Sequence, residues 1–421
     1  MFSTRPAREH SLRKRMISHV YSKSYIQASE SSRAQSRVII FDRLLPLLAH
    51  SASASQAPHG LDVHTTFLAA TMDFISAYIF GIRNSTNFLR GKAYRDHWLQ
   101  LYMSRHDYPF FPQEFPRLTW LLRKLGVPPY PKWVDGANQE MRDWNEKLCK
   151  GALETSASVK GEASSSEDDP VVLRTLLAGL QKEKAANGKE SLVYSTAILQ
   201  QDLTINSELF DHVLAGQETA GVTLTYLTWQ LSRDLPLQQK LQKELLSLQP
   251  SLAINGRSEG AIPDVRALDA LPTLQAVLLE TLRLHAALPG PLPRQTPYPS
   301  CRLGPYTIPG GVRVAALAHT LHRDESVFPE PEKFDHTRWL EDGTDEDDRK
   351  ERHRRFWAFS SGGRMCIGSN FAMQGRLGRG QPRRGAGKLT SRAEMKLIVA
   401  AIYSNFRTHI VDDAGMEQTD G

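Results

Sequence analysis

Cysteine is scarce in this sequence. Only Cys149, Cys301 and Cys366 occur in 421 residues, and no two of them form a Cys-x-x-Cys pair. This spacing argues against a disulfide framework and against a tetrahedral zinc site. Scattered cysteines of this kind favour a reducing compartment or the cytosolic side of a membrane.

Long apolar runs are also missing. The N-terminal residues 1–22 are basic and polar, and they lack the apolar core of a secretory signal peptide. The most apolar stretch, Phe67–Ile82, carries Asp73 and is too short to span a bilayer. We therefore expect this stretch to form a buried helix.

Acidic residues are absent from one basic stretch, Gly375–Ala393, which accounts for the whole formal charge of +6. Its cations are Arg376, Arg379, Arg383, Arg384, Lys388 and Arg392. Because the rest of the chain carries balanced charge, we predict no nucleic-acid partner. The chain length and the apolar content of 40% are typical of a soluble globular protein with a large core.

One cysteine lies in a glycine-rich loop, within the stretch FWAFSSGGRMCIGSN at residues 356–370. Gly362, Gly363 and Gly368 remove side chains where a backbone could approach a flat ligand closely. The helix predicted after the loop would favour the thiolate form of Cys366. A thiolate is a suitable ligand for haem iron, whereas the alternative is a buried structural cysteine in a turn.

The loop also matches a known spacing, F-x-x-G-x-R-x-C-x-G. Its fixed positions are Phe359, Gly362, Arg364, Cys366 and Gly368. This pattern resembles the haem-binding signature of the cytochrome P-450 monooxygenases. The resemblance implies that Cys366 is the axial ligand of a haem b iron and that the other four residues contact the cofactor. No Cys-x-x-Cys-His occurs, so covalent attachment of the haem is not expected.

A long helix is predicted at Glu208–Arg233, with the sequence AGQETA at its centre. A threonine inside a helix ordinarily bonds only to its own preceding turn. Here the combination of Gly216, Glu218 and Thr219 resembles the oxygen-activation motif of the same family. The resemblance implies that Thr219 and Glu218 guide protons toward bound oxygen, while Gly216 opens the backbone.

A second helix is predicted at Leu271–Leu284, with Glu280 and Arg283 three residues apart. Most such pairs are exposed and contribute little to stability. The E-x-x-R pattern followed by a proline-rich exit resembles the family's signature helix. In that helix the pair is buried and joined by a later arginine, which implies a structural triad with Arg338.

The segment that carries Arg338 departs from the family pattern. The family normally reads Pro-Glu-Arg there, whereas this chain has His336 and Thr337 before the arginine. Local support for Arg338 is therefore expected to be weaker. Arg294 follows the signature helix and is a candidate partner for a haem propionate, because a guanidinium grips a carboxylate through two hydrogen bonds.

A second propionate contact is implied near the N-terminus. His10 and Lys14 lie four residues apart on a helix predicted at Arg8–Tyr25, with lysine where the family usually has arginine. That alignment implies that the chain begins inside the family pattern, without the membrane anchor, the first strands and the loop above the substrate. The C-terminus is likewise expected to stop before a final hairpin.

Other elements follow from periodicity and turn residues. We predict helices at Val38–Leu48, Asp62–Ile82 and Glu394–Ile410, short helices and turns over Trp98–Trp133, an exposed polar loop at Ser156–Asp169, and a hairpin at Tyr306–Thr320 turning at Pro309–Gly311.

The basic stretch Gly375–Ala393 interrupts a helix that would otherwise run from Ser369–Gln374 into Glu394. Its glycines and proline are incompatible with a helix. We hypothesise that it is an insertion or a retained non-coding segment. The alternative is a natural basic loop that docks an acidic redox partner.

Together these patterns predict a mainly α fold with a minor β component, as one incomplete haem domain over residues 1–421. The resemblance implies monooxygenation of an apolar organic substrate by dioxygen, with electrons from an NADPH-dependent flavoprotein reductase. Two alternatives are a haem-thiolate isomerase or dehydratase and a non-catalytic remnant. The family usually resides at the cytosolic face of the endoplasmic-reticulum membrane; this chain shows no anchor, so we expect it to be cytosolic or peripheral.

Overall fold

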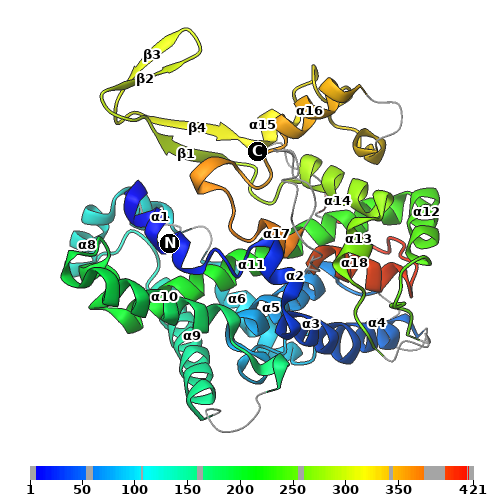
Figure 1. Ribbon diagram of the computed structural model, residues 1–421, viewed down its shortest axis with the longest axis horizontal. Helices are drawn as coiled ribbons and strands as arrows, with labels where there is room; N and C mark the ends of the chain where they lie inside the picture. Colours follow the sequence, from blue (N-terminus) through cyan, green and yellow to red (C-terminus); the bar gives the residue numbers. More distant parts are fainter. Residues whose placement is uncertain are drawn as a thin grey trace. The chain divides into compact units, whose positions relative to one another are not determined.

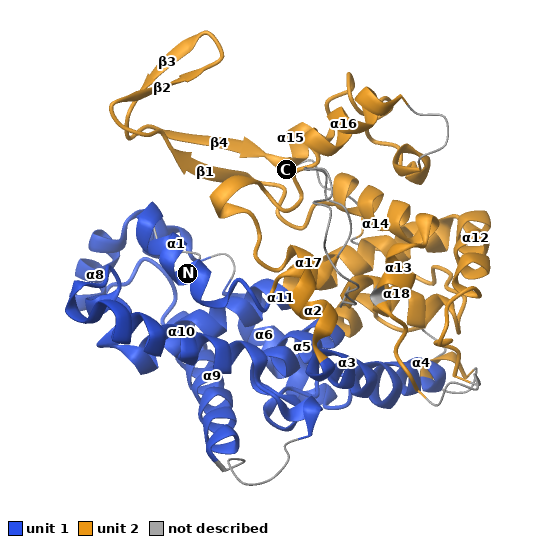
Figure 2. Ribbon diagram, in the orientation of Figure 1, with its two compact units in different colours: residues 1–20, 30–50, 69–217 blue, residues 21–29, 51–68, 218–421 orange. Residues whose placement is uncertain are grey.

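The computed structural model describes residues 6–53, 60–105, 108–158, 165–254, 260–340, 345–373, 394–414 and 416. Helices dominate and strands are few (Figure 1), so the predicted mainly α fold with a minor β component is confirmed. The chain forms two compact units, shown in Figure 2. The first comprises residues 1–20, 30–50 and 69–217, and the second comprises residues 21–29, 51–68 and 218–421.

The first unit is helical throughout its described part. Its elements are α1 (Ala7–Ile17), α3 (Glu30–Arg37), η1 (Val38–Leu44), η2 (Ile82–Asn84), α6 (Lys92–Ser104), α7 (Phe110–Glu114), α8 (Pro116–Lys124), α9 (Trp133–Ser158), η4 (Ser166–Asp168), α10 (Val171–Asn187), η5 (Gly188–Glu190) and η6 (Tyr194–Ile198). Three helices contribute residues to both units: α4 (Leu45–Ala52), α5 (Val63–Phe80) and α11 (Gln201–Arg233).

The second unit combines helices with two short antiparallel strand pairs. Its elements are α2 (Lys23–Ala28), α12 (Leu235–Leu245), α13 (Val265–Asp269), α14 (Pro272–Leu284), β1 (Pro291–Gln295), β2 (Ser300–Leu303), β3 (Tyr306–Pro309), β4 (Arg313–Leu317), α15 (Ala318–His322), η7 (His336–Trp339), α16 (Glu346–Arg355), η8 (Gly362–Arg364), α17 (Ser369–Ala372) and α18 (Glu394–Tyr403). Within it, α14 packs against α12, α18 and η7.

The apolar helix α5 is buried, as its sequence predicted. Among the described residues, α5 is the one helix that is long and apolar enough to cross a membrane, yet 83% of it is buried inside the protein. Its acidic residue, Asp73, accepts hydrogen bonds from Arg43 at 3.1 Å, the Thr86 hydroxyl at 2.7 Å and the Phe88 amide at 2.7 Å. Burial raises the pKa of Asp73, and these donors offset part of that cost.

Two glycines let α11 pack closely against α5. A Cβ atom on Gly216 would lie 2.5 Å from Ile75 Cγ1, and one on Gly221 would lie 2.7 Å from Leu68 Cδ2. Neither distance leaves room for a side chain. Gly216 is therefore needed for the packing of α11 against α5, which the oxygen-activation motif did not predict.

The predicted hairpin over Tyr306–Thr320 is wrong in its pairing. β3 pairs with β2 and β4 pairs with β1, so the two strands of the prediction are not partners. The tight turn lies at Gly304 and Pro305, because Gly304 adopts a φ of +58° that favours glycine. The expected turn at Pro309–Gly311 is instead a corner, where the Thr296 hydroxyl donates to Pro309 O at 2.6 Å.

Two predicted helices are shorter than expected. The helix expected over Arg8–Tyr25 breaks after Ile17, because the Ser22 hydroxyl caps a new helix by accepting from the Tyr25 amide at 3.2 Å. The helix expected to reach Ile410 ends at Tyr403. There the Asn405 side chain donates to Ala401 O at 2.7 Å and satisfies a carbonyl at the helix end.

The remaining expectations are mostly confirmed. Helices occur where Val38–Leu48, Asp62–Ile82, Glu208–Arg233 and Leu271–Leu284 were predicted, and short helices fill much of Trp98–Trp133. The first of these begins as a π-helix, and α11 starts earlier than predicted. The expected loop at Ser156–Asp169 begins inside α9, and its residues 159–164 lie outside the described part. The basic stretch Gly375–Ala393 also lies outside it.

Candidate functional site

Cys366 lies in a tight loop before α17. The Cys366 amide donates to Phe359 O at 2.9 Å, which closes the loop. Ser360 and Gly362 both adopt positive φ values, of 59° and 68°. A non-glycine residue in that region stores backbone strain, and such residues gather at functional sites. The Cys366 side chain is exposed.

Open space lies beside the glycines of this loop. A Cβ atom on Gly362 or Gly363 would meet no described atom within 4 Å. A Cβ atom on Gly368 would meet only Cys366 Sγ, at 3.9 Å. Unlike Gly216, these glycines do not make room for neighbouring protein, so their neighbourhood has room for a ligand close to the backbone.

Two arginines converge next to the loop. Arg294 of β1 donates from Nη2 to the Ser360 hydroxyl at 2.7 Å. Burial and the nearby charge of Arg294 lower the pKa of Arg364, which is half-buried in η8. Two guanidinium groups repel each other at close range, so an anionic group between them would relieve the repulsion.

Glu280 and Arg283 form a fully buried ion pair on α14. Arg283 donates from Nε to Glu280 Oε2 at 2.9 Å and from Nη2 to Glu280 Oε1 at 2.8 Å. Its remaining donors reach backbone carbonyls, including Pro331 O at 2.7 Å. Arg338 Nε lies 3.4 Å from Glu280 Oε1. The structure thus brings the three residues of the expected triad together.

Glu280 has further partners that the sequence did not indicate. Trp339 donates from Nε1 to Glu280 Oε2 at 2.8 Å, and the Asp335 amide donates to Oε1 at 2.9 Å. The Asp335 carboxylate in turn accepts from the Thr337 amide at 3.0 Å and caps the short helix η7. Trp339 and Asp335 therefore hold the Arg338 segment, although His336 and Thr337 replace the family's usual residues.

His322 joins the ion-pair helix to the start of the cysteine loop. The Trp357 amide donates to His322 Nε2 at 2.7 Å, so the ring proton resides on Nδ1, which donates to Arg283 O at 2.9 Å. The imidazole also stacks on Phe356, with ring centroids 5.4 Å apart and planes 13° apart. Burial lowers the pKa of His322 to about 4, so the ring is neutral at pH 7.

The predicted oxygen-activation residues lie on an unbroken part of α11. Glu218 and Thr219 are both half-buried, and the helix continues through them without a π or 3₁₀ interruption. The Thr219 carbonyl accepts from the Thr223 hydroxyl at 2.8 Å. The helix is thus continuous through Gly216, where the resemblance implied an opened backbone.

Residues 1–375 match the family described as Cytochrome P-450. The chain belongs to the cytochrome P-450 family. The resemblance predicted from the cysteine loop is therefore confirmed. The family binds a haem-iron cofactor, and the curated relatives of this chain are named as monooxygenases.

Three relatives show the likeness over different lengths. The cytochrome P-450 monooxygenase hkm5 of Aspergillus hancockii is 38% identical over 39% of this chain and 30% of its own length. FGM1 of Gibberella zeae is 31% identical over 60% of this chain and 45% of its own length. For avaI of Aspergillus versicolor, 26% identity extends over 89% of this chain and 81% of the relative. The chain thus spans about 30% of the length of a relative such as hkm5.

The cytochrome P-450 loop residues of this chain fit a haem. The exposed sulfur of Cys366, the open space beside Gly362 and the converging Arg294 and Arg364 suit an iron, a flat macrocycle and its carboxylates respectively. All four residues belong to the second unit.

His10 and Lys14 belong to the first unit. His10 is buried and Lys14 half-buried on α1, and neighbouring Arg13 donates to Glu208 at 2.9 Å. Their contact with a haem propionate stays a prediction.

His322 and Trp339 are the residues that sequence reasoning missed. Trp339 directly follows the triad arginine, and that adjacency was the available signal. His322 carried no signal, because a histidine after a strand has no pattern that distinguishes a buried bridge from a surface residue. Only the tertiary fold brings it to both Arg283 and Trp357.

The depressed pKa of His322 predicts acid-dependent stability. Unfolded histidine titrates near 6.5, whereas the folded ring stays neutral to about 4, so between those values the unfolded state binds more protons. The free energy of unfolding should therefore fall by about 1.4 kcal/mol per pH unit from this group as the pH drops from 6.5 to 4. Urea unfolding followed by circular dichroism at pH 7, 6 and 5 measures it.

The matched comparison uses His322→Gln and His50→Gln. His322→Gln should show a shallower pH dependence than the unsubstituted chain. Part of the remaining slope should come from His212 and His285, whose pKa burial also lowers to about 4. His50 is exposed on α4, and His50→Gln controls for the loss of a histidine outside the buried core. Equal slopes in all three proteins would show that His322 is not held neutral.

Proposed function

We propose that this chain is a haem-dependent monooxygenase that inserts one oxygen atom from dioxygen into an apolar organic substrate. Its electrons come from an NADPH-dependent flavoprotein reductase. The observation that carries the proposal is the strained loop that presents the exposed Cys366 sulfur beside open space. The family match and the names of the relatives support the reaction class.

Residues of the loop and of β1 would hold haem b. The Cys366 thiolate would bind the haem iron, and Phe359 and Gly368 would line the cofactor. Arg294 and Arg364 would bind its propionates, where a carboxylate separates the two like charges. When bound, a thiolate-ligated haem binds dioxygen and favours cleavage of its O–O bond.

Thr219 and Glu218 would move protons to the reacting oxygen. The threonine hydroxyl can donate one hydrogen bond and accept another, and the adjacent carboxylate can supply the next proton. An isomerase or dehydratase of the haem-thiolate type usually lacks this acid–alcohol pair, so its presence favours the monooxygenase.

The triad and His322 would have a structural part in this function. Glu280, Arg283 and Arg338 fix α14 and η7 to each other. His322 then transmits the position of Arg283 to Trp357, near the start of the cysteine loop. None of these four residues is proposed to touch the reacting atoms.

The role of Cys366 predicts the result of one substitution. Cys366→Ala should abolish the carbon monoxide difference band of thiolate-ligated haem and also turnover, because no other side chain of the loop can supply a thiolate. The measurements are haem content and the reduced carbon monoxide difference spectrum of the purified chain.

Cys301→Ala is the matched control, because Cys301 lies on β2 and is also outside any disulfide. It should keep the spectrum of the unsubstituted chain. Haem binding and turnover that persist in Cys366→Ala would contradict the proposal. An unsubstituted chain that binds no haem would favour the non-catalytic remnant.

The role of Thr219 predicts a loss of coupling. Thr219→Ala should lower the product formed per NADPH consumed by about tenfold or more, since positioned proton transfer contributes at least that much. The carbon monoxide spectrum should stay unchanged. The control Thr223→Ala removes a hydroxyl that only bonds its own helix, and it should keep the coupling. Equal coupling in both variants would contradict the proton role.

We also propose that the chain attaches peripherally to the cytosolic face of the endoplasmic-reticulum membrane. An exposed apolar surface over α7 and α8 supports this. Its large side chains are 47–66% exposed and comprise Phe110, Phe115, Leu118, Trp120, Leu121 and Leu125. Arg117 and Lys124 flank them and suit anionic headgroups, in the manner of an interfacial amphipathic helix.

Vesicle flotation tests this attachment. Trp120→Glu with Leu121→Glu should release the chain from phosphatidylcholine–phosphatidylserine vesicles, because acidic side chains oppose both burial and the surface charge. Leu246→Glu, at an even more exposed apolar position just after α12, should leave binding intact. Release of both variants, or of neither, would contradict membrane binding through α7 and α8.

A further inference from the structure

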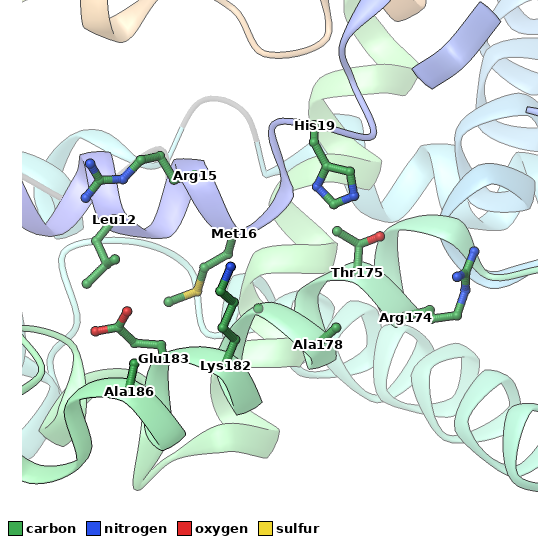
Figure 3. Close-up of a pocket in the computed structure, with 11 residues that line it drawn as sticks. Leu12, Arg15, Met16, His19, Arg174, Thr175, Ala178, Lys182, Glu183 and Ala186 are labelled. Atoms are coloured by element: carbon green, nitrogen blue, oxygen red, sulfur yellow. The ribbon is translucent and has the colours of Figure 1, made fainter. Parts of the chain in front are cut away.

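A cavity of about 470 Å³ lies in the first unit, between α1 and α10. Figure 3 shows side chains from both helices around it. Its volume is within the range of small-molecule pockets. None of its lining residues belongs to the haem-binding or proton-transfer residues proposed above, so it calls for a separate explanation.

The inner part of the cavity is apolar. Leu12 and Met16 of α1 line it, together with Ala178, Gly179 and Ala186 of α10. A Cβ atom on Gly179 would lie 2.7 Å from Met16 Cβ, so the glycine permits the two helices to approach closely there. The small side chain of Ala178 then leaves space beside that contact. This part suits a compact apolar body and offers it few hydrogen bonds.

The rim carries an excess of positive charge. Arg15 of α1 and Lys182 of α10 are exposed, and neither has an ion-pair partner in the described part of the chain. Arg174 also lines the cavity, but it donates to Asp169 at 2.8 and 3.0 Å. Arg15 and Lys182, which come from two different helices, are therefore available to bind an anion.

One acidic residue, Glu183, also lines the cavity; it offsets part of this positive charge but forms no ion pair with Arg15 or Lys182 in the described part of the chain. Glu183 Oε1 accepts from the Ser191 hydroxyl at 2.7 Å and from Asn187 Nδ2 at 2.9 Å, which engages it with its own neighbourhood. Charge complementarity thus calls for a ligand with one anionic group at the rim and an apolar part on the floor.

We propose that the cavity between α1 and α10 binds a small organic carboxylate with an apolar tail. Its head would lie between Arg15 and Lys182, and its tail would cover Met16 and Ala178. Both parts are needed: a neutral molecule leaves the cations without a partner, and an inorganic anion leaves the apolar floor exposed to water.

Octanoate is the probe, and octan-1-ol is its neutral counterpart. Isothermal titration calorimetry on the full chain should show octanoate binding. Octan-1-ol should bind at least about tenfold more weakly, because it lacks the charge-assisted hydrogen bonds. Octanoate binding should also weaken as salt is raised, since the cations are exposed.

Three variants locate the binding. Lys182→Met should weaken octanoate about tenfold and leave octan-1-ol unchanged. Ala178→Phe should exclude both probes by filling the floor, while keeping both cations. Lys184→Met removes an exposed cation of α10 outside the cavity, and should change neither probe.

Circular dichroism establishes that each variant is folded before titration, and Ala178 and Lys182 are exposed positions that tolerate change. Octanoate binding that is equal in Lys182→Met, Ala178→Phe and Lys184→Met would overturn the proposal, because it would place the carboxylate elsewhere. Equal affinity for octanoate and octan-1-ol would also overturn it. Self-association reversed by Ala178→Phe, without octanoate binding, would assign the cavity to a second copy of the chain and contradict it.

Discussion

The buried ion pair of Glu280 and Arg283 is the interaction on which the second unit depends. Both side chains are fully removed from water, where an isolated charge would be very costly. Their mutual attraction alone does not offset that cost. Hydrogen bonds from the surrounding protein offset the rest of the cost. Their donors and acceptors come from segments far apart in the chain, at His322, Pro331, Lys333, Asp335 and Trp339. Removing either charge leaves the other uncompensated, at a cost of about 3–5 kcal/mol.

The same pair reaches the cysteine loop through one neutral histidine. His322 donates to the carbonyl of Arg283 and accepts from the amide of Trp357, so a helix and a loop share a single rigid ring. A charged imidazole could not accept that second hydrogen bond. Burial, which lowers the pKa of the ring, therefore preserves the connection at neutral pH.

Glycine serves two different purposes in this molecule. Gly216, Gly221 and Gly179 lie where a side chain would collide with a neighbouring helix, so they allow close packing. Gly362 and Gly363 face open space instead, and Gly362 also needs a positive φ. A motif that only counts glycines cannot separate the two cases. Their surroundings do separate them, because the glycines of the cysteine loop leave open space where a ligand could approach the backbone.

Cation placement shows a similar contrast. Arg283 has its donors filled by protein, and Arg294 already bonds Ser360. Arg15 and Lys182 remain at the rim of the cavity between α1 and α10. Net charge alone would not have distinguished these roles, because the basic stretch Gly375–Ala393 accounts for all of it.

The sequence by itself determined the family, the mainly α fold and the position of α5, α11 and α14, because motif spacing and helical periodicity are local properties of the chain. It also indicated that Glu280, Arg283 and Arg338 belong together. The strand pairing was wrong, because Gly304 as well as Gly310 and Gly311 could form a turn, and only the pairing itself selects between them. Only the tertiary structure revealed the bridging roles of His322 and Trp339 and the cavity beside Met16. Each depends on contacts between distant segments, and no motif in this chain marked those contacts.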